Sequence, residues 1–368
     1  MAPIHLVRPE VRAERAYRVP TTTDVAAKVD QNESPFGLPE VVTRAALEHA
    51  LATPWNRYPD DRPHRLVEAL ATRLGLPPEA VIVGHGSNEI THTVGLCFLD
   101  AGTSVVLPHP MFSLYASVAR MHGARLVEVD PRPDFGHDAD AILEAAVEAD
   151  APLTVVTTPN NPTGQSISHA ALDRLASGVP GVLLIDEAYH EFVTGPTAVD
   201  LLGQHDNVLV MRTFSKAMGM AGVRLGLLLG APALIQEIEK ARVPFLVDRW
   251  GEAIGLAMLD QTDLIAERVR TLVAGREALV NWMGALEGVE TVPSDANFFL
   301  FRTPLDVATL RERMAARGVL IRDVSGYPAL APRDGKPGWA RVSVGTDAEN
   351  AAFRTALTEV LSEATQSA

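Results

Sequence analysis

Short apolar runs alternate with helix-like segments between residues 40 and 211, and this alternation restricts the fold more than any other feature of the sequence. The runs expected to be strands cover residues 81–83, 104–107, 125–129, 153–157, 182–185 and 208–211. Strands that are apolar on both faces, separated by helices, are typical of βαβ units in a mostly parallel sheet. The sequence therefore predicts an α/β fold, whose ligands lie beyond the carboxyl ends of the strands.

The pattern changes near residue 250, which predicts a second and smaller domain. Residues 251–283 form a long helical pattern with no internal proline. Strand-like runs and two more helical segments follow it, as expected for an α+β unit. We therefore expect an N-terminal arm over residues 1–40, a large domain over 41–250, and a linking helix with a small α+β domain over 251–368.

Composition narrows the classes of function. The chain has 46 acidic and 32 basic residues, a formal net charge of −14, and such a surface repels nucleic acid and anionic membranes. The single cysteine, Cys97, excludes an internal disulfide and cysteine-based metal sites, and its apolar neighbours predict a buried thiol. The sequence has no apolar run long enough to cross a bilayer and no secretion signal at its N-terminus. We expect a cytoplasmic protein with no nucleic-acid, membrane or metal partner.

Two segments rich in small polar residues follow predicted strands. Gly-His-Gly-Ser-Asn-Glu at 84–89 opens a helix, where glycines and free N–H groups favour an anion. It is not the dinucleotide fingerprint, because Glu89 stands at the third glycine position, and a helix cap by Ser87 explains it equally well. In Thr-Pro-Asn-Asn-Pro-Thr-Gly at 158–164, a plain turn accounts for the prolines, but the adjacent asparagines are also placed to reach a ligand.

Two charged side chains also follow predicted strands. Asp186 begins the segment Asp-Glu-Ala-Tyr, which ends at Tyr189. A carboxylate at the end of a buried strand needs a cationic or hydrogen-bonding partner, although it can also cap the next helix. Lys216 lies in a glycine- and methionine-rich stretch, where low polarity and a neighbouring cation lower the pKa of a lysine and make it a nucleophile. A lone lysine is otherwise an ordinary surface residue.

Together the four segments supply an anion cradle, an acid, a phenol with an amide, and an amine, which are the groups that pyridoxal phosphate requires. The order of these four segments and the residues in them resemble those of the class I and II aminotransferases of fold type I, and the resemblance covers residues 31–346. The resemblance implies pyridoxal 5'-phosphate as cofactor and a mostly parallel seven-stranded sheet covered by helices in the large domain. It implies that Lys216 binds the cofactor aldehyde and acts as the base, and that Asp186 pairs with the ring nitrogen. Tyr189 and Asn161 are implied to bond the ring oxygen.

The same resemblance assigns the remaining cofactor contacts. Phe112 stands where this family stacks an aromatic ring on the cofactor; many relatives carry tyrosine there, so this chain lacks a hydroxyl at that position. The residues implied to bind the cofactor are completed by Gly86, Ser87, Asn88, Thr213, Ser215 and Arg224. Arg224 is the fixed charge for the phosphate, and the helix that starts at Ser87 adds its dipole.

Segments expected to face the substrate are similar to histidinol-phosphate aminotransferases. Residues 30–37 match that group's Asn-Glu-Asn-Pro-Phe-Gly pattern except that Ser34 replaces the second asparagine, and Asn32 is implied to line the substrate site. The N-terminal arm is implied to join the small domain and the dimer contact, with Tyr17 touching the substrate phosphate. Tyr58 is implied to reach the cofactor phosphate of the neighbouring subunit in a homodimer.

Two arginines of the small domain are candidates for binding substrate anions. Arg341 matches the family arginine that holds an α-carboxylate by a planar two-point contact. Arg322 is expected to bind a second anion, either a phosphate or the distal carboxylate of glutamate. A solvated arginine at a strand end is the alternative for Arg322.

The resemblance implies transamination between a small-molecule amino donor and a 2-oxo acid, with histidine biosynthesis as the setting. The expected reaction converts L-histidinol phosphate and 2-oxoglutarate to imidazole acetol phosphate and L-glutamate. An aromatic amino-acid aminotransferase would share every cofactor residue but needs no anion partner at the far end of its substrate. A threonine-phosphate decarboxylase-like enzyme would need no 2-oxoglutarate. A ligand sensor with this body would carry an N-terminal DNA-binding domain, and residues 1–40 contain no helix-turn-helix pattern.

Overall fold

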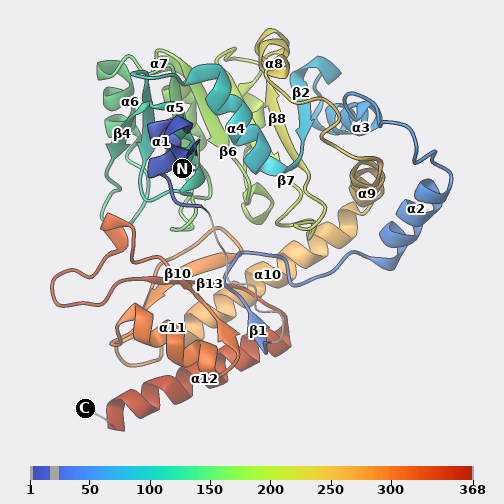
Figure 1. Ribbon diagram of the computed structural model, residues 1–368. Helices are drawn as coiled ribbons and strands as arrows, with labels where there is room; N and C mark the ends of the chain where they lie inside the picture. Colours follow the sequence, from blue (N-terminus) through green and yellow to red (C-terminus); the bar gives the residue numbers. More distant parts are fainter. Residues whose placement is uncertain (1–2, 17–24, 367–368) are drawn as a thin grey trace.

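The computed structural model describes residues 3–16 and 25–366, which form a large body and a smaller one (Figure 1). The large body contains a seven-stranded sheet in the order β2-β8-β7-β6-β5-β3-β4. Only β8 runs antiparallel to its two neighbours, so the sheet is mostly parallel, as the sequence predicts. Its strands are β2 (Val81–Gly84), β3 (Ser104–Pro108), β4 (Arg125–Val129), β5 (Leu153–Thr157), β6 (Val182–Asp186), β7 (Val208–Thr213) and β8 (Gly226–Gly230).

Helices cover both faces of this sheet because its strands are apolar on both faces. In β6, Leu183 and Ile185 enter one buried apolar cluster, whereas Leu184 between them enters another, as the alternation of side chains along a strand requires. The helices of the large body are α2 (Glu40–Leu51), α3 (His64–Leu74), α4 (Gly86–Phe98), α5 (Leu114–His122), α6 (Ala139–Glu148), α7 (His169–Gly178), α8 (Pro232–Glu239) and α9 (Arg249–Leu259). The short α1 (Pro9–Ala13) packs against α5.

The smaller body is an α+β unit built around an antiparallel sheet in the order β12-β13-β10-β9. Its sheets contain β9 (Glu290–Thr291), β10 (Phe298–Arg302), β12 (Arg322–Asp323) and β13 (Ala340–Ser343), and the pair β1 (Ala27–Lys28) and β11 (Val319–Leu320). The parallel pairing of β1 with β11 anchors the N-terminal segment in this body. The helices are α10 (Thr262–Met283), α11 (Val307–Ala316) and α12 (Asp347–Gln366), which pack around buried phenylalanines such as Phe301 and Phe353.

Short 3-10 helices complete the secondary structure of the described residues. They are η1 (Pro3–Leu6), η2 (Pro78–Ala80), η3 (His190–Phe192), η4 (Ala198–Leu201) and η5 (Pro328–Leu330). Of the helices in these ranges, none combines the length and apolar character that crossing a membrane requires.

Two details differ from the sequence prediction. The helical pattern over 251–283 is interrupted, because α9 ends at Leu259 and α10 begins at Thr262. The Thr262 hydroxyl donates a hydrogen bond to the Leu259 carbonyl. Local bonds of this kind, between a side chain and the backbone, favour an interruption over a continuous helix. The prediction of a buried thiol was also wrong. Cys97 is exposed, because it lies in the last turn of α4 beside the exposed Leu96.

Candidate active site

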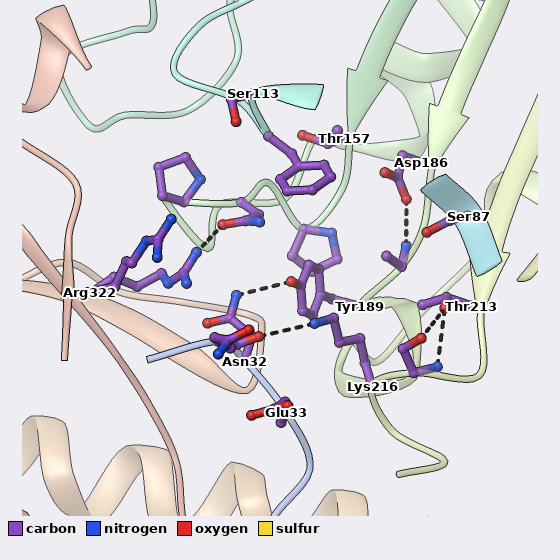
Figure 2. Close-up of a pocket in the computed structure, with 18 of the residues that line it drawn as sticks. Asn32, Glu33, Ser87, Ser113, Thr157, Asp186, Tyr189, Thr213, Lys216 and Arg322 are labelled. Atoms are coloured by element: carbon purple, nitrogen blue, oxygen red, sulfur yellow. Dashed lines mark hydrogen bonds between the residues drawn. The ribbon is translucent and has the colours of Figure 1, made fainter. Parts of the chain in front are cut away.

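A cavity of about 480 Å³ lies where the carboxyl ends of β5, β6 and β7 meet the small body and the segment after β1 (Figure 2). This is the position that the sheet topology predicts for a ligand. Most of the candidate residues chosen from the sequence line it together. They are Asn32, Ser87, Asn88, Phe112, Asn161, Asp186, Tyr189, Thr213, Ser215, Lys216, Arg224, Arg322 and Arg341.

Lys216 follows β7 and lines the cavity; no carboxylate of the described residues forms an ion pair with its amine, although the charges of Glu33 and Asp186 act on it. Its Nζ donates to the carbonyl oxygen of Gln31 at 3.3 Å and lies 5.6 Å from the centre of the Tyr189 ring. Burial, and secondly the positive charge of Arg341, lower the pKa of Lys216 to about 8. The unprotonated fraction of this amine near neutral pH is therefore larger than in an ordinary lysine, and the unprotonated form is the one that attacks a carbonyl carbon.

Asp186 ends β6 and is fixed through both carboxylate oxygens. The backbone N–H of Ala188 donates to Oδ1 at 3.0 Å, and the Tyr115 hydroxyl donates to Oδ2 at 2.7 Å. Burial raises the pKa of Asp186 to about 6, while these hydrogen bonds act in the opposite direction. The result is a fixed acid on the cavity wall that can pair with a protonated nitrogen. Sequence reasoning missed Tyr115, whose only signal was its place three residues after Phe112.

Tyr189 and Asn161 lie on the cavity wall, each with a partner from outside the large sheet. The Tyr189 hydroxyl accepts a hydrogen bond from the side-chain amide of Asn32 at 3.0 Å, and burial raises the pKa of Tyr189 to about 12. The Asn161 side-chain oxygen accepts a hydrogen bond from Arg341. A phenol and an amide are thus both available to a ligand oxygen, as the resemblance implies.

An anion cradle is formed by the first turn of α4 and the segment after β7. Ser87 and Asn88 stand in that first turn, where backbone N–H groups and the helix dipole favour a negative charge. Gly86 does not line the cavity but permits this arrangement: it has a φ of 77°, and a Cβ there would clash with the guanidinium of Arg224. The hydroxyls of Thr213 and Ser215, linked to each other at 3.0 Å, complete the cradle.

Arg322 and Arg341 face the cavity from the small body. They are directly opposed residues on the neighbouring strands β12 and β13, so their side chains leave the same face of the sheet. The Arg341 guanidinium also donates to the carbonyl oxygen of Asp30 at 2.8 Å. Figure 2 shows Arg322 on the side of the cavity opposite Asp186. Tyr327, the first residue of the proline- and glycine-rich segment 327–338, also lines the cavity.

Tyr58 lies away from this cavity, and Tyr17 falls outside the described residues. The side chain of Tyr58 is 78% exposed and does not line this chain's cavity; its ring stacks on Phe245 with 4.9 Å between centroids. Within residues 3–16 and 25–366, histidine, cysteine and acidic side chains form no cluster suited to a metal ion.

The groups around the cavity fit pyridoxal phosphate by their chemistry. The glycine-dependent cradle at Gly86 suits a phosphate, and the buried amine of Lys216 suits an aldehyde. Asp186 suits a heterocyclic nitrogen, Tyr189 a ring oxygen, and the half-buried Phe112 a flat ring. The cavity therefore has one matching group for each polar part of that cofactor.

Comparison with known proteins agrees with this assignment. The family model of aminotransferase class I and II matches residues 27–357. A histidinol-phosphate aminotransferase of Chlorobaculum tepidum is 37% identical over 325 residues, which cover 88% of this chain and 93% of the relative. That of Chlorobium chlorochromatii is 36% identical over 356 residues, covering 97% of this chain and 96% of the relative.

A solved structure is similar over nearly the whole chain. The histidinol-phosphate aminotransferase from Sinorhizobium meliloti, determined in complex with pyridoxal-5'-phosphate, has a TM-score of 0.85 and 27% identity. The match covers 96% of this chain and 97% of that one. The chain therefore belongs to the class I and II aminotransferases, pyridoxal-phosphate enzymes of fold type I, and within them to the histidinol-phosphate aminotransferase group.

Proposed function

We propose that this enzyme transfers the amino group of L-histidinol phosphate to 2-oxoglutarate, giving imidazole acetol phosphate and L-glutamate in histidine biosynthesis. The observation that carries the proposal is the opposed pair Arg322 and Arg341 on the cavity face of β12 and β13. Like charges directly opposite each other across two strands repel. A phosphate dianion, or two carboxylates, relieves this repulsion and gains charge-assisted hydrogen bonds.

The same pair of arginines serves both proposed substrates. L-Histidinol phosphate presents one phosphate, and 2-oxoglutarate presents two carboxylates. L-Phenylalanine presents a single carboxylate and would leave one guanidinium without an anion. Among the described residues, none forms an ion pair with Arg322, so this cation in particular favours a substrate with a second or doubly charged anion over an aromatic amino acid.

Pyridoxal phosphate, when bound, supplies an electron sink for the charge that forms at the substrate Cα. The cradle of Ser87, Asn88, Thr213, Ser215 and Arg224 would hold its phosphate. Asp186 would hold a proton on its ring nitrogen by offering a fixed negative charge. Lys216, with its lowered pKa, would bind the aldehyde and afterwards take the proton from the substrate Cα. Asn32 orients the Tyr189 hydroxyl by a hydrogen bond.

The test compares amino donors in steady state with 2-oxoglutarate as acceptor. We expect kcat/KM for L-histidinol phosphate to exceed that for L-phenylalanine by more than about tenfold, since a phosphate gains charged hydrogen bonds that a phenyl ring lacks. A preference for phenylalanine would identify an aromatic amino-acid aminotransferase instead. Release of carbon dioxide from O-phospho-L-threonine without 2-oxoglutarate would support the decarboxylase alternative.

We also propose that the enzyme is a homodimer in which Tyr58 of each subunit completes the cofactor site of the other. Tyr58 is exposed and outside its own cavity, and several large apolar residues are exposed as well. Val41, Leu47 and Leu51 belong to α2, which stands at the edge of the molecule, and Trp55 follows α2 in the chain (Figure 1). Val243 and Phe245 come from the segment whose Phe245 ring stacks on Tyr58. A patch of this kind favours burial against a second copy of the chain.

Mixing two inactive variants tests the shared site. Lys216→Ala keeps Tyr58, and Tyr58→Ala keeps Lys216, so a mixed dimer has one site with both residues. We expect activity to appear when the two variants are unfolded and refolded together. Each variant refolded alone is the control. A monomer by sedimentation analysis, or no recovery on mixing, would contradict the proposal.

A further inference from the structure

The hydroxyl of Tyr115 meets the site at Asp186. It comes from α5, its side chain is 4% exposed, and it is absent from the residues that line the cavity. Its hydroxyl nevertheless donates to Oδ2 of Asp186 at 2.7 Å. The opposite oxygen of the same carboxylate is bound by the Ala188 N–H at 3.0 Å. Each carboxylate oxygen thus accepts one hydrogen bond, and the orientation of the carboxylate toward the cavity depends on these two donors.

The charge state of Asp186 depends on the same contact. Burial favours the neutral acid, and the neighbouring Glu187 acts in the same direction. Tyr115, Ala188 and the positive charge of Lys216 oppose it. Tyr189 is the other titratable group that interacts with Asp186, and its pKa is raised, so it stays neutral. Of the groups that favour the ionised carboxylate, only Tyr115 is a side chain that does not line the cavity.

We propose that Tyr115 is a positioning residue that holds the Asp186 carboxylate ionised and oriented toward the cofactor's ring nitrogen. The inference rests on the proposed role of Asp186. Burial and the adjacent Asp186 carboxylate raise the pKa of Tyr115 well above its usual value. The hydroxyl therefore keeps its proton over the working pH range, and it donates at every pH at which the enzyme acts.

The test removes one hydroxyl with Tyr115→Phe and observes the ring nitrogen directly. The holoenzyme is prepared with pyridoxal phosphate that carries 15N in its ring, and the nitrogen resonance is recorded by NMR at pH 7.5. We expect the variant's resonance to move toward the unprotonated position, because Asp186 without its donor retains the proton. We also expect kcat to fall about tenfold, since one hydrogen bond to a charged group is lost, with KM changed less than about twofold.

A matched control deletes a buried hydroxyl that has no part in the site. Thr154 lies in β5, is 1% exposed, and has a hydroxyl without a hydrogen-bond partner among the described residues. Thr154→Val should leave both the nitrogen resonance and kcat unchanged. An effect of Thr154→Val equal to that of Tyr115→Phe would show a general packing effect and overturn the inference.

Asp186→Asn separates this inference from the proposed function. If Asp186→Asn moves the resonance and Tyr115→Phe does not, Asp186 has its proposed role and the inference about Tyr115 is wrong. If neither variant moves it, the assignment of Asp186 fails, and the inference fails with it. We expect the double variant to match Asp186→Asn in kcat, because Tyr115 acts only through that carboxylate. A further loss in the double variant would contradict the inference.

Discussion

Asn32 and Tyr189 are 157 positions apart in the chain, yet the Asn32 amide donates to the Tyr189 hydroxyl at 3.0 Å. Asn32 is itself fixed by Ser343 of β13, which accepts its backbone N–H at 2.9 Å and donates to its side-chain oxygen at 3.1 Å. It has a φ of 55°, a left-handed conformation that asparagine tolerates better than most residues. This contact joins the small body to the phenol on the large sheet.

Asn32→Asp tests that contact with almost no change in shape. A carboxylate accepts hydrogen bonds but donates none, so the Tyr189 hydroxyl would turn its proton toward residue 32 and away from a ligand. We expect kcat to fall about tenfold, the loss of one hydrogen bond. Ser34→Ala, in the same segment but outside the cavity, is the control and should keep full turnover. Unchanged turnover in Asn32→Asp would remove Asn32 from the site.

Arg322→Gln tests the two-cation account of specificity. We expect KM for L-histidinol phosphate to rise about ten- to hundredfold, because a charged hydrogen-bond pair is lost. KM for L-phenylalanine should change less than about twofold. Arg333→Gln, an exposed change in the nearby loop, should affect neither substrate. An equal change in KM for the two amino donors would mean that Arg322 does not bind the second anion of the substrate.

Lys216 should lower the stability of the cofactor-free protein. Its pKa of about 8 in the folded state lies below the ordinary 10.5, so protonation costs stability at all pH values below 8. That cost disappears as pH rises from 8 to about 10.5. Lys216→Met should therefore be more stable by about 3 kcal/mol at pH 7 in urea unfolding. The difference should vanish above pH 10.5; a difference independent of pH would be incompatible with a desolvated amine of lowered pKa.

The buried ion pair between Glu187 and Arg212, just after the end of β6, should stabilise the folded protein. Glu187 is 3% exposed and accepts hydrogen bonds from Arg212 at 2.8 Å and from the backbone N–H of Ala198 at 2.7 Å. Arg212→Met leaves the carboxylate buried without its cation, and we expect a loss of about 3 kcal/mol in the free energy of unfolding.

The exposed pair Arg44–Glu40 is the matched control for that measurement. Its side chains are 68% and 83% exposed, so Arg44→Met should change stability by less than about 0.5 kcal/mol. Similar losses in the free energy of unfolding for Arg44→Met and Arg212→Met would show that burial of the Glu187–Arg212 pair does not increase its contribution to stability.

The sequence predicts six of the strands of the large sheet because each is marked by its own apolar residues. β8 (Gly226–Gly230) was not among these predicted runs, and its antiparallel direction has no local signal. The division at residues 40 and 250 and the cytoplasmic location stay predictions. Strand ends placed Asp186 and Lys216 correctly at the cavity because the carboxyl ends of parallel strands meet at one edge.

Contacts made by packing between distant segments were beyond sequence reasoning. The Tyr115 hydroxyl reaches Asp186 from a helix 71 residues earlier, and the place of Tyr115 three residues after Phe112 does not predict that pairing. Tyr327 stands in a proline- and glycine-rich stretch typical of surface loops, yet it lines the cavity, because it closely follows β12, whose residues Arg322 and Asp323 line the cavity as well. Both residues depend on tertiary packing rather than on local pattern.

Lys216 and its neighbours are proposed to perform two half-reactions on bound pyridoxal phosphate. The visible absorption spectrum of the purified holoenzyme is recorded after the amino donor is added and again after 2-oxoglutarate is added. We predict that L-histidinol phosphate bleaches the visible band, that 2-oxoglutarate restores it, and that Lys216→Ala does neither. A band that no amino donor bleaches, or a Lys216→Ala variant that cycles like the parent enzyme, would contradict the account.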